Sequence, residues 1–274
     1  MLTQRGIELR EDDQHEDAIE TFRAAMALGE RSAPRELAYA LMGTERPREA
    51  LKVVKRAIKT GRVDLYSLLG LLAVKLGEVK LADRSYRKAI ESGDLSALND
   101  YGSFLGDEGR FEEAIATLLR SAEFGDVLAP GNLISIYVED LDDLDSALQA
   151  GLKYLDPTRL TVYPALAEVY AHLDRLDDAE DLFRQGIELQ APRVHQRYGE
   201  FLRRYRQDFV AAERELWAAF DNDESGWSRV LGSFLVERGR TDEARAVLER
   251  GAAWGDLDAQ EMLLDLGAPG STPR

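Results

Sequence analysis

The chain has 274 residues, of which 45% are hydrophobic and 31% are charged, and its formal net charge is −16. This composition favours a soluble protein with a buried core and excludes a chain that is basic overall and coats nucleic acid. There is no cysteine, which excludes a disulfide framework or a thiolate site and suits a reducing compartment.

The first 13 residues contain no long apolar run, so we expect no secretory signal. No stretch of the sequence approaches the roughly 18 consecutive apolar residues of a membrane span, so we expect no integral membrane association. We therefore expect a cytoplasmic protein.

Along the chain, small residues recur at nearly constant spacing. They are Ala18, Ala50, Ala82, Ala114, Ala147, Ala179, Ala212 and Ala244. The successive steps are 32, 32, 32, 33, 32, 33 and 32 residues. A period of this size is typical of stacked helical repeats.

Each repeat reads as a pair of helices. Most of the alanines are followed by a bulky residue four positions later and a small residue seven positions later, as in Ala82, Tyr86 and Ala89. Residues at these offsets lie on one face of a helix. A second helical pattern lies 12 or 13 residues earlier, around a small residue such as Gly70, and glycines such as Gly77 mark the turn between the two helices.

The repeats predict one all-α solenoid over residues 1–266. It contains about eight helix pairs of about 32 residues, followed by a short C-terminal helix that caps the eighth pair. Residues 267–274 are rich in Gly, Pro, Ser and Thr, and we expect a disordered tail there. Repeats five and seven each carry one extra residue before the alanine, so we expect the regular geometry to bend at those two places.

This pattern resembles the tetratricopeptide-repeat family, whose first helix carries a large residue, Leu-Gly and Tyr, and whose second helix carries Ala, Phe and Ala. Repeat three carries the resemblance through Tyr66, Leu69, Gly70, Ala82, Tyr86 and Ala89. The resemblance implies a right-handed superhelix whose first helices line a concave groove. It also implies a non-enzymatic scaffold or adaptor that binds another protein.

Few residues suggest chemistry. His15, His172 and His195 share no ligand spacing, so we expect no metal site, no cofactor and no catalytic residues. Acidic stretches at residues 139–145 and 221–226 are interpreted as loops and helix caps rather than calcium sites. One groove position of successive repeats varies too much for a nucleic-acid code, so we expect no nucleic-acid partner.

Polar residues that packing leaves on the groove side of the first helices are candidates for partner binding. They are Asn99, Asn132, Arg193, Gln196, Arg197, Arg203, Arg204 and Arg229. Arginine can bond a carboxylate through two parallel hydrogen bonds, and asparagine can hold a peptide backbone. We therefore predict a groove for an extended peptide, with an acidic or C-terminal carboxylate end near repeat seven. In the alternative, these arginines pair with acidic neighbours such as Glu168 or Glu200.

A second candidate surface is basic and lies on the outer, convex side of repeats two and three. Its residues are Lys52, Lys55, Arg56 and Lys59, and, 32 residues after three of these, Arg84, Arg87 and Lys88. The spacing places each set on one helix face, where it could dock an acidic partner or a membrane surface. The alternative for this set is a solvated outer face.

Two functions remain open from the sequence. The first is a scaffold with an open groove that binds a partner protein or peptide. The second is a regulatory module that senses a ligand or peptide, and it would change its shape on binding.

Overall fold

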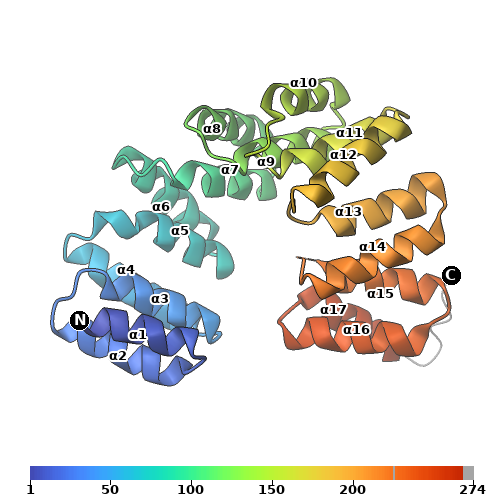
Figure 1. Cartoon of the computed structure of the whole chain (residues 1–274). Helices are drawn as coiled ribbons and strands as arrows, with labels where there is room; N and C mark the ends of the chain where they lie inside the picture. Colours follow the sequence, from blue (N-terminus) through green and yellow to red (C-terminus); the bar gives the residue numbers. More distant parts are fainter. Residues whose placement is uncertain (225, 268–274) are drawn as a thin grey trace. The chain divides into compact units, whose positions relative to one another are not determined.

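The computed structural model describes residues 1–224 and 226–267, which form α-helices with short 3-10 and π-helical turns (Figure 1). No β-strand occurs in these ranges. The all-α solenoid of helix pairs is therefore confirmed. Contacts divide the chain into two compact units, Met1–Asp126 and Val127–Arg274, and each unit is described by itself.

The first unit holds repeats one to four. Its elements are α1 (Leu2–Glu11), α2 (His15–Ala27), α3 (Ala33–Gly43), α4 (Pro47–Lys59), the 3-10 turn η1 (Val63–Leu65), α5 (Tyr66–Lys75), α6 (Val79–Glu91), α7 (Ala97–Asp107) and α8 (Phe111–Glu123). Odd-numbered helices are the first helices of their repeats, and even-numbered helices are the second.

The second unit holds repeats five to eight and the C-terminal helix. Its elements are α9 (Ala129–Ser135), the π turn η2 (Ile136–Asp140), α10 (Leu144–Tyr154), α11 (Val162–His172), α12 (Leu176–Glu188), α13 (Val194–Phe201), the π turn η3 (Leu202–Arg206), α14 (Phe209–Asp221), α15 (Trp227–Glu237), α16 (Thr241–Ala253) and α17 (Leu257–Gly267). The single solenoid over residues 1–266 stays a prediction. Gly267 ends α17, and the other residues of the predicted tail, 268–274, lie outside the described residues.

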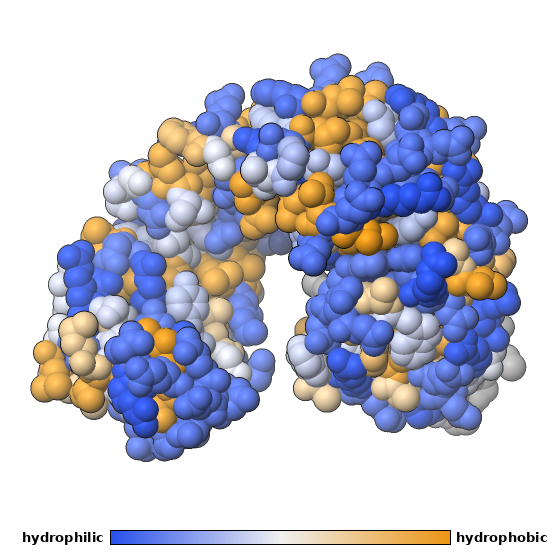
Figure 2. Space-filling model, viewed as in Figure 1, coloured by the Kyte–Doolittle hydropathy of each residue, from blue (hydrophilic) through white to orange (hydrophobic). Residues whose placement is uncertain are grey.

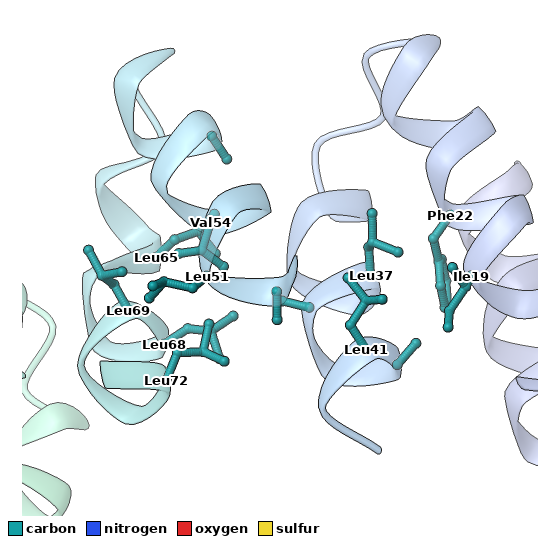
Figure 3. Packing of buried hydrophobic residues seen from close by; sticks show 14 of the residues in the cluster. Ile19, Phe22, Leu37, Leu41, Leu51, Val54, Leu65, Leu68, Leu69 and Leu72 are labelled. Carbon is teal, nitrogen blue, oxygen red and sulfur yellow. The ribbon is translucent and has the colours of Figure 1, made fainter. Parts of the chain in front are cut away.

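The alanines of the ladder form the centre of the core. All eight lie in second helices and are 0% exposed. In repeat three, a Cβ atom added to Gly70 would lie only 2.7 Å from the ring of Tyr86, so the ring packs directly on the backbone of the first helix. Figure 3 shows the same layer in repeats one and two, where Phe22 from α2 faces Leu37 and Leu41 from α3.

In most repeats, the same kind of tight turn joins the first helix to the second. Gly77 has a φ of +68°, the left-handed conformation that ends a first helix, and Glu78 is the N-cap of the second helix α6. In repeat six, Asp174 takes the same conformation with a φ of +57°. The amide of Glu78 donates to the carbonyl of Ala73 at 2.8 Å, which bridges five residues.

An arginine at the start of several second helices links neighbouring repeats, and we call this contact the arginine clasp. Arg110 bonds Glu113 in its own helix at 2.6 Å and Asp83 in the preceding second helix at 2.7 Å. The same clasp joins Arg46 to Glu49 and Glu16. It recurs at the start of α16, from Arg240 to Glu243 and Glu213.

The C-terminal helix α17 packs on α15 and α16, and its role as a cap stays a prediction. Ala259 is fully buried in that contact. Leu257 and Leu264 on the same helix are 74% and 76% exposed. The helix therefore contacts the end of the stack through only one of its sides.

Candidate functional site

A hollow of about 240 Å³ opens on the first-helix side of repeats five to eight. Its walls come from η2, α11, α13, η3 and the first turn of α15. Its lining residues are Val138, Glu139, Glu168, Ala171, His172, Arg193, Gln196, Arg197, Glu200, Phe201, Arg204, Tyr205 and Arg229. The volume is below the roughly 300–1,000 Å³ of most small-molecule sites, so it suits one or two side chains or a chain end.

A buried ion pair lies at the base of the hollow. The guanidinium of Arg197 bonds the carboxylate of Glu168 and lies 3.7 Å from that of Glu139. The Arg197 side chain is only 13% exposed. Because α11 carries Glu168 and α13 carries Arg197, the pair also joins repeats six and seven.

The surroundings of Glu168 raise the pKa of its carboxyl group. Burial raises the pKa of Glu168 to about 7, because the charged carboxylate loses water there. Arg197 opposes this rise, whereas the negative charges of Glu139 and Glu200 add to it. The base of the hollow therefore holds a carboxyl group that titrates near neutral pH.

Within the ranges that the structure describes, the other arginines at the hollow have a distant acidic partner or none. Among the described residues, no carboxylate forms an ion pair with Arg193 or Arg204. Arg193 donates only a long hydrogen bond of 3.4 Å to Gln196, and Arg229 lies 3.8 Å from Asp258. Burial, and secondly the charge of Arg197, lower the pKa of Arg193. Four arginines and three glutamates line the hollow, so the formal charge of the lining is +1.

The structure brings together five of the eight groove candidates. Arg193, Gln196, Arg197, Arg204 and Arg229 all line the hollow. Of these, Gln196 is 1% exposed, and its backbone N–H donates to the carboxylate of Glu224 at 2.9 Å, which holds the residue against the next loop. The expectation that its side chain is open to a partner therefore needs correction.

The remaining three candidates lie elsewhere. Arg203 points to α15, where it lies 2.8 Å from both carboxylate oxygens of Glu237. Asn99 belongs to the first unit and is 8% exposed, so it too is buried rather than open. Its side chain hydrogen-bonds to Asp100. Asn132 lies half-buried on α9.

The sequence alone did not identify several lining residues as site residues. Glu139, His172, Phe201 and Tyr205 were not proposed, although Glu139 and Tyr205 fall in the two stretches where the repeat gains a residue. The two 33-residue steps in the alanine spacing were the sequence signal that could have pointed to Glu139 and Tyr205. Glu168 was named only as a possible pairing partner, and the structure gives it that role with Arg197.

Among the described residues, some basic side chains of the predicted convex surface contact an acidic or aromatic partner, whereas the others form no ion pair. Lys55 lies 3.7 Å from Glu78, Arg87 lies 3.1 Å from Asp83, and Lys88 lies 5.3 Å from the ring centre of Tyr66. In the described part of the chain, the other members of this set form no ion pair. They are Lys52, Arg56, Lys59 and Arg84.

A groove of about 730 Å³ runs between α2 and α4 at the edge of this convex surface. Met26 and Val53 contribute half-buried apolar surface to it. Lys52 and Arg56 border it as exposed cations that form no ion pair with any residue the structure describes. The groove thus combines apolar contact with positive charge.

None of the described helices is both long enough and apolar enough to cross a bilayer. Over α14 and α16, the face drawn in Figure 2 is mostly hydrophilic, with hydrophobic residues scattered among the polar ones. Single apolar residues of this kind are normal on a solvated surface.

Sequence comparisons identify relatives of part of the chain. Residues 67–132 match the family model described as tetratricopeptide repeat. A segment of 75 residues, 27% of the chain, is 39% identical to the type IV pilus assembly protein PilF of Pseudomonas aeruginosa. The match spans only 29% of the length of PilF.

Solved structures share the fold at low sequence identity. A tetratricopeptide-repeat protein from Parabacteroides merdae aligns with a TM-score of 0.58 at 16% identity, over 85% of this chain and 96% of that one. The C-terminal part of a repeat protein from Cytophaga hutchinsonii aligns with a TM-score of 0.54 at 18% identity, over 84% and 99% of the two chains. These likenesses support the stacked-helix fold.

Proposed function

We propose that the chain is a tetratricopeptide-repeat protein that acts as a non-enzymatic scaffold and holds an extended segment of a partner protein in the hollow of its second unit. Tetratricopeptide-repeat proteins generally mediate protein–protein interactions. Their stacked helices offer long surfaces rather than enclosed reaction sites.

Unneutralised positive charge at the hollow is the observation that carries this proposal. Arg193 and Arg204 border the hollow without an ion pair among the described residues, and the chain as a whole is strongly acidic. A guanidinium in such a place can bond a carboxylate through two parallel hydrogen bonds. We therefore propose that the bound segment contributes an acidic side chain or a C-terminal carboxylate.

The buried pair of Arg197 and Glu168 gives the hollow a fixed base. Breaking a buried pair leaves an uncompensated charge, so the pair resists rearrangement when a segment binds. Binding then depends on the arginines at the rim, while Arg197 stays with Glu168. This division assigns recognition to Arg193, Arg204 and Arg229.

Fluorescence anisotropy with two labelled decapeptides tests the proposal. One peptide ends in two aspartates with a free carboxylate, and the matched peptide has asparagines and an amidated end. A charge-assisted hydrogen bond contributes about 1.5–3 kcal/mol, and 1.4 kcal/mol is a tenfold change in Kd. We expect the variant with Arg204→Glu and Arg229→Glu to bind the acidic peptide at least tenfold more weakly than the wild type.

A control variant makes the same kind of charge reversal at a single arginine that lies away from the hollow. Arg184 lies on the second helix α12 and is 61% exposed, away from the hollow lining. The variant Arg184→Glu should leave the Kd unchanged within about twofold. Equal affinity of the wild type for both peptides, or unchanged binding after the double reversal, would refute the proposal.

The alternative function, a sensing module, makes a different prediction. A sensor changes its population of shapes on binding, because its ligand prefers one of two states. Small-angle X-ray scattering with and without the acidic peptide separates the two. We expect no change in radius of gyration for a scaffold.

We propose the groove between α2 and α4 as a second docking surface, for an acidic segment of a partner protein. Its half-buried Met26 and Val53 would contact apolar side chains, and Lys52 and Arg56 would pair with the acidic ones. Such binding weakens as salt screens the charges. Binding of an acidic amphipathic peptide that is equally strong at 50 mM and 500 mM salt would contradict it.

We also propose a cytoplasmic location, which the cysteine-free composition suits. Fractionation of the native host, with antibody detection of this chain, tests it.

A further inference from the structure

The extra residues of repeats five and seven lie at equivalent positions, at the end of the first helix of each repeat. In repeat six, which has a 32-residue step, the amide of Arg175 donates to the carbonyl of Tyr170, five residues back, at 2.9 Å. In repeat five, the amide of Asp143 donates to the carbonyl of Tyr137, six residues back, at 2.8 Å. In repeat seven, Asp208 bonds Leu202 in the same way at 3.1 Å.

Each extra residue therefore becomes a π turn at the end of a first helix. The turns are η2 in repeat five and η3 in repeat seven. Single π turns are costly irregularities that often occur at functional sites. They leave the second helices in register, since Ala147 and Ala212 are both fully buried at their usual place.

Both π turns form walls of the same hollow. The turn η2 contributes Val138 and Glu139, and the turn η3 contributes Arg204 and Tyr205. Between them lies the regular end of α11, with Ala171. The two inserted residues of an otherwise regular array therefore flank the same hollow. Folding of the repeats does not by itself require both insertions to lie there.

The turn η3 changes where a side chain points. In repeat eight, Arg238 lies three residues after Leu235 and stacks over Phe209 on the second helix α14, at 5.0 Å. In repeat seven, Tyr205 lies three residues after Leu202 but lines the hollow instead.

The ring of Tyr205 has aromatic neighbours in the hollow. Its centre lies 6.3 Å from that of His172 and 5.7 Å from that of Phe201. Aromatic rings at such separations attract one another, and they offer a flat surface to a further apolar group.

The turn η2 extends the reach of repeat five. From η2, the carboxylate of Glu139 lies 3.7 Å from the guanidinium of Arg197 in repeat seven, across the intervening α11. Glu139 and Tyr205 therefore define two sides of the hollow, and both lie in turns that regular repeats lack.

We propose that the extra residues of repeats five and seven determine the specificity of the hollow, so that it selects an acidic residue next to an aromatic one. Arg204 faces the acidic group, and Tyr205 with His172 packs against the aromatic side chain. This inference rests on the function proposed above, because it names the kind of segment that the same site selects.

Deleting one residue from each turn tests the proposal, since each deletion restores a 32-residue repeat. The deletion of Arg206 keeps Arg204 and Tyr205, and the deletion of Asp140 keeps Val138 and Glu139. Because Arg206 also bonds Asp177 at 2.5 Å, the matched controls are Arg206→Ala and Asp140→Ala, which keep the turns. Circular dichroism and thermal melting establish that all four variants fold.

The binding measurement uses two labelled peptides with free carboxylate ends that differ only in Phe or Ala beside two aspartates. We expect the wild type and both controls to prefer the Phe peptide by about fivefold, the size of an aromatic contact. Both deletions should abolish this preference. A deletion variant that is folded and keeps the preference would overturn the proposal.

A measurement without peptide separates this inference from the proposed function. We expect nuclear Overhauser contacts between the rings of His172 and Tyr205 in the wild type and in Arg206→Ala, and their loss when Arg206 is deleted. Contacts that persist in the deletion variant overturn the role of η3, even if acidic peptides bind. Failure of both peptides to bind the wild type refutes the proposed function instead.

If a deletion unfolds the second unit, Tyr205→Ala takes its place, because it keeps the π turn. This variant should lose the preference for Phe and retain the affinity for the Ala peptide. An unchanged preference would contradict the assignment of Tyr205.

Discussion

The carboxyl group of Glu168 should make the stability of the second unit depend on pH. Its folded pKa is about 7, compared with an ordinary value of 4.5. A carboxyl whose pKa is raised by folding adds stability that is complete below its unfolded pKa and is lost as the pH rises through the folded value. The window for Glu168 is therefore about pH 4.5 to 7.

The size of the effect follows from the two pKa values. Each pKa unit corresponds to about 1.36 kcal/mol, so the shift gives a loss of roughly 3 kcal/mol across the window. The side chain is 28% exposed, so it is mostly shielded from solvent screening. Glu168→Gln removes the titration while keeping a neutral group of similar shape. The variant should therefore lose roughly 3 kcal/mol less than the wild type between pH 4.5 and 8.

Urea unfolding followed by tryptophan fluorescence provides the assay. Trp217, Trp227 and Trp254 are the three tryptophans of the chain, and all lie in the second unit. The signal therefore reports the unit that contains Glu168. Parallel stability curves for the two proteins between pH 4.5 and 8 would refute the reasoning. So would a Glu168 carboxyl that titrates in its ordinary range by carbon-13 NMR.

Three further predictions concern packing, capping and a second titrating pair. Gly70→Ala should destabilise the first unit by roughly 1–3 kcal/mol in thermal melts followed by circular dichroism, because the new methyl group would overlap the buried ring of Tyr86. Asp208→Ala should cost the second unit about 1 kcal/mol by tryptophan fluorescence, since its carboxylate caps α14. Hydrogen bonding to Glu215 raises the pKa of His195, so His195→Ala should cost roughly 1.5–3 kcal/mol near pH 6, and less once the pH exceeds the raised pKa. Equal losses at pH 6 and pH 9 in urea unfolding would contradict the last prediction.

The fold could be predicted from the sequence because its packing rule is local. Ala82 and Tyr86 lie on one helix face, and Gly70 lies on the preceding helix of the same repeat. Their contact therefore depends on residues within one 32-residue segment, and the rule recurs along the chain. The extra residue of repeat seven was visible in the same way, but its π-helical form depends on hydrogen bonding that the spacing does not specify.

The candidate site was less predictable, because the choice of partner for each side chain depends on neighbouring repeats. Arg203 and Arg204 are adjacent in sequence, yet Arg203 bonds Glu237 from the next repeat and Arg204 faces the hollow. Gln196 is buried, and its backbone N–H donates to Glu224 from the following loop. Helical spacing assigns a side to each residue, whereas burial and pairing are set by contacts between repeats.

The arginine clasp has a consequence for how such a chain can grow. Its donor and acceptor lie 27 residues apart in Arg110 and Asp83, and 30 residues apart in Arg46 and Glu16, so each clasp spans about one repeat. A tandem duplication of repeats three and four together would copy the acceptor Asp83 with the donor Arg110. A copy of repeat four alone would add a second donor without a second acceptor, because Ile115 stands at the position of Asp83 in that repeat. Genes for this chain could therefore lengthen by such pairs of repeats without leaving an unmatched clasp. A copy of repeat five or seven would also duplicate a wall of the hollow.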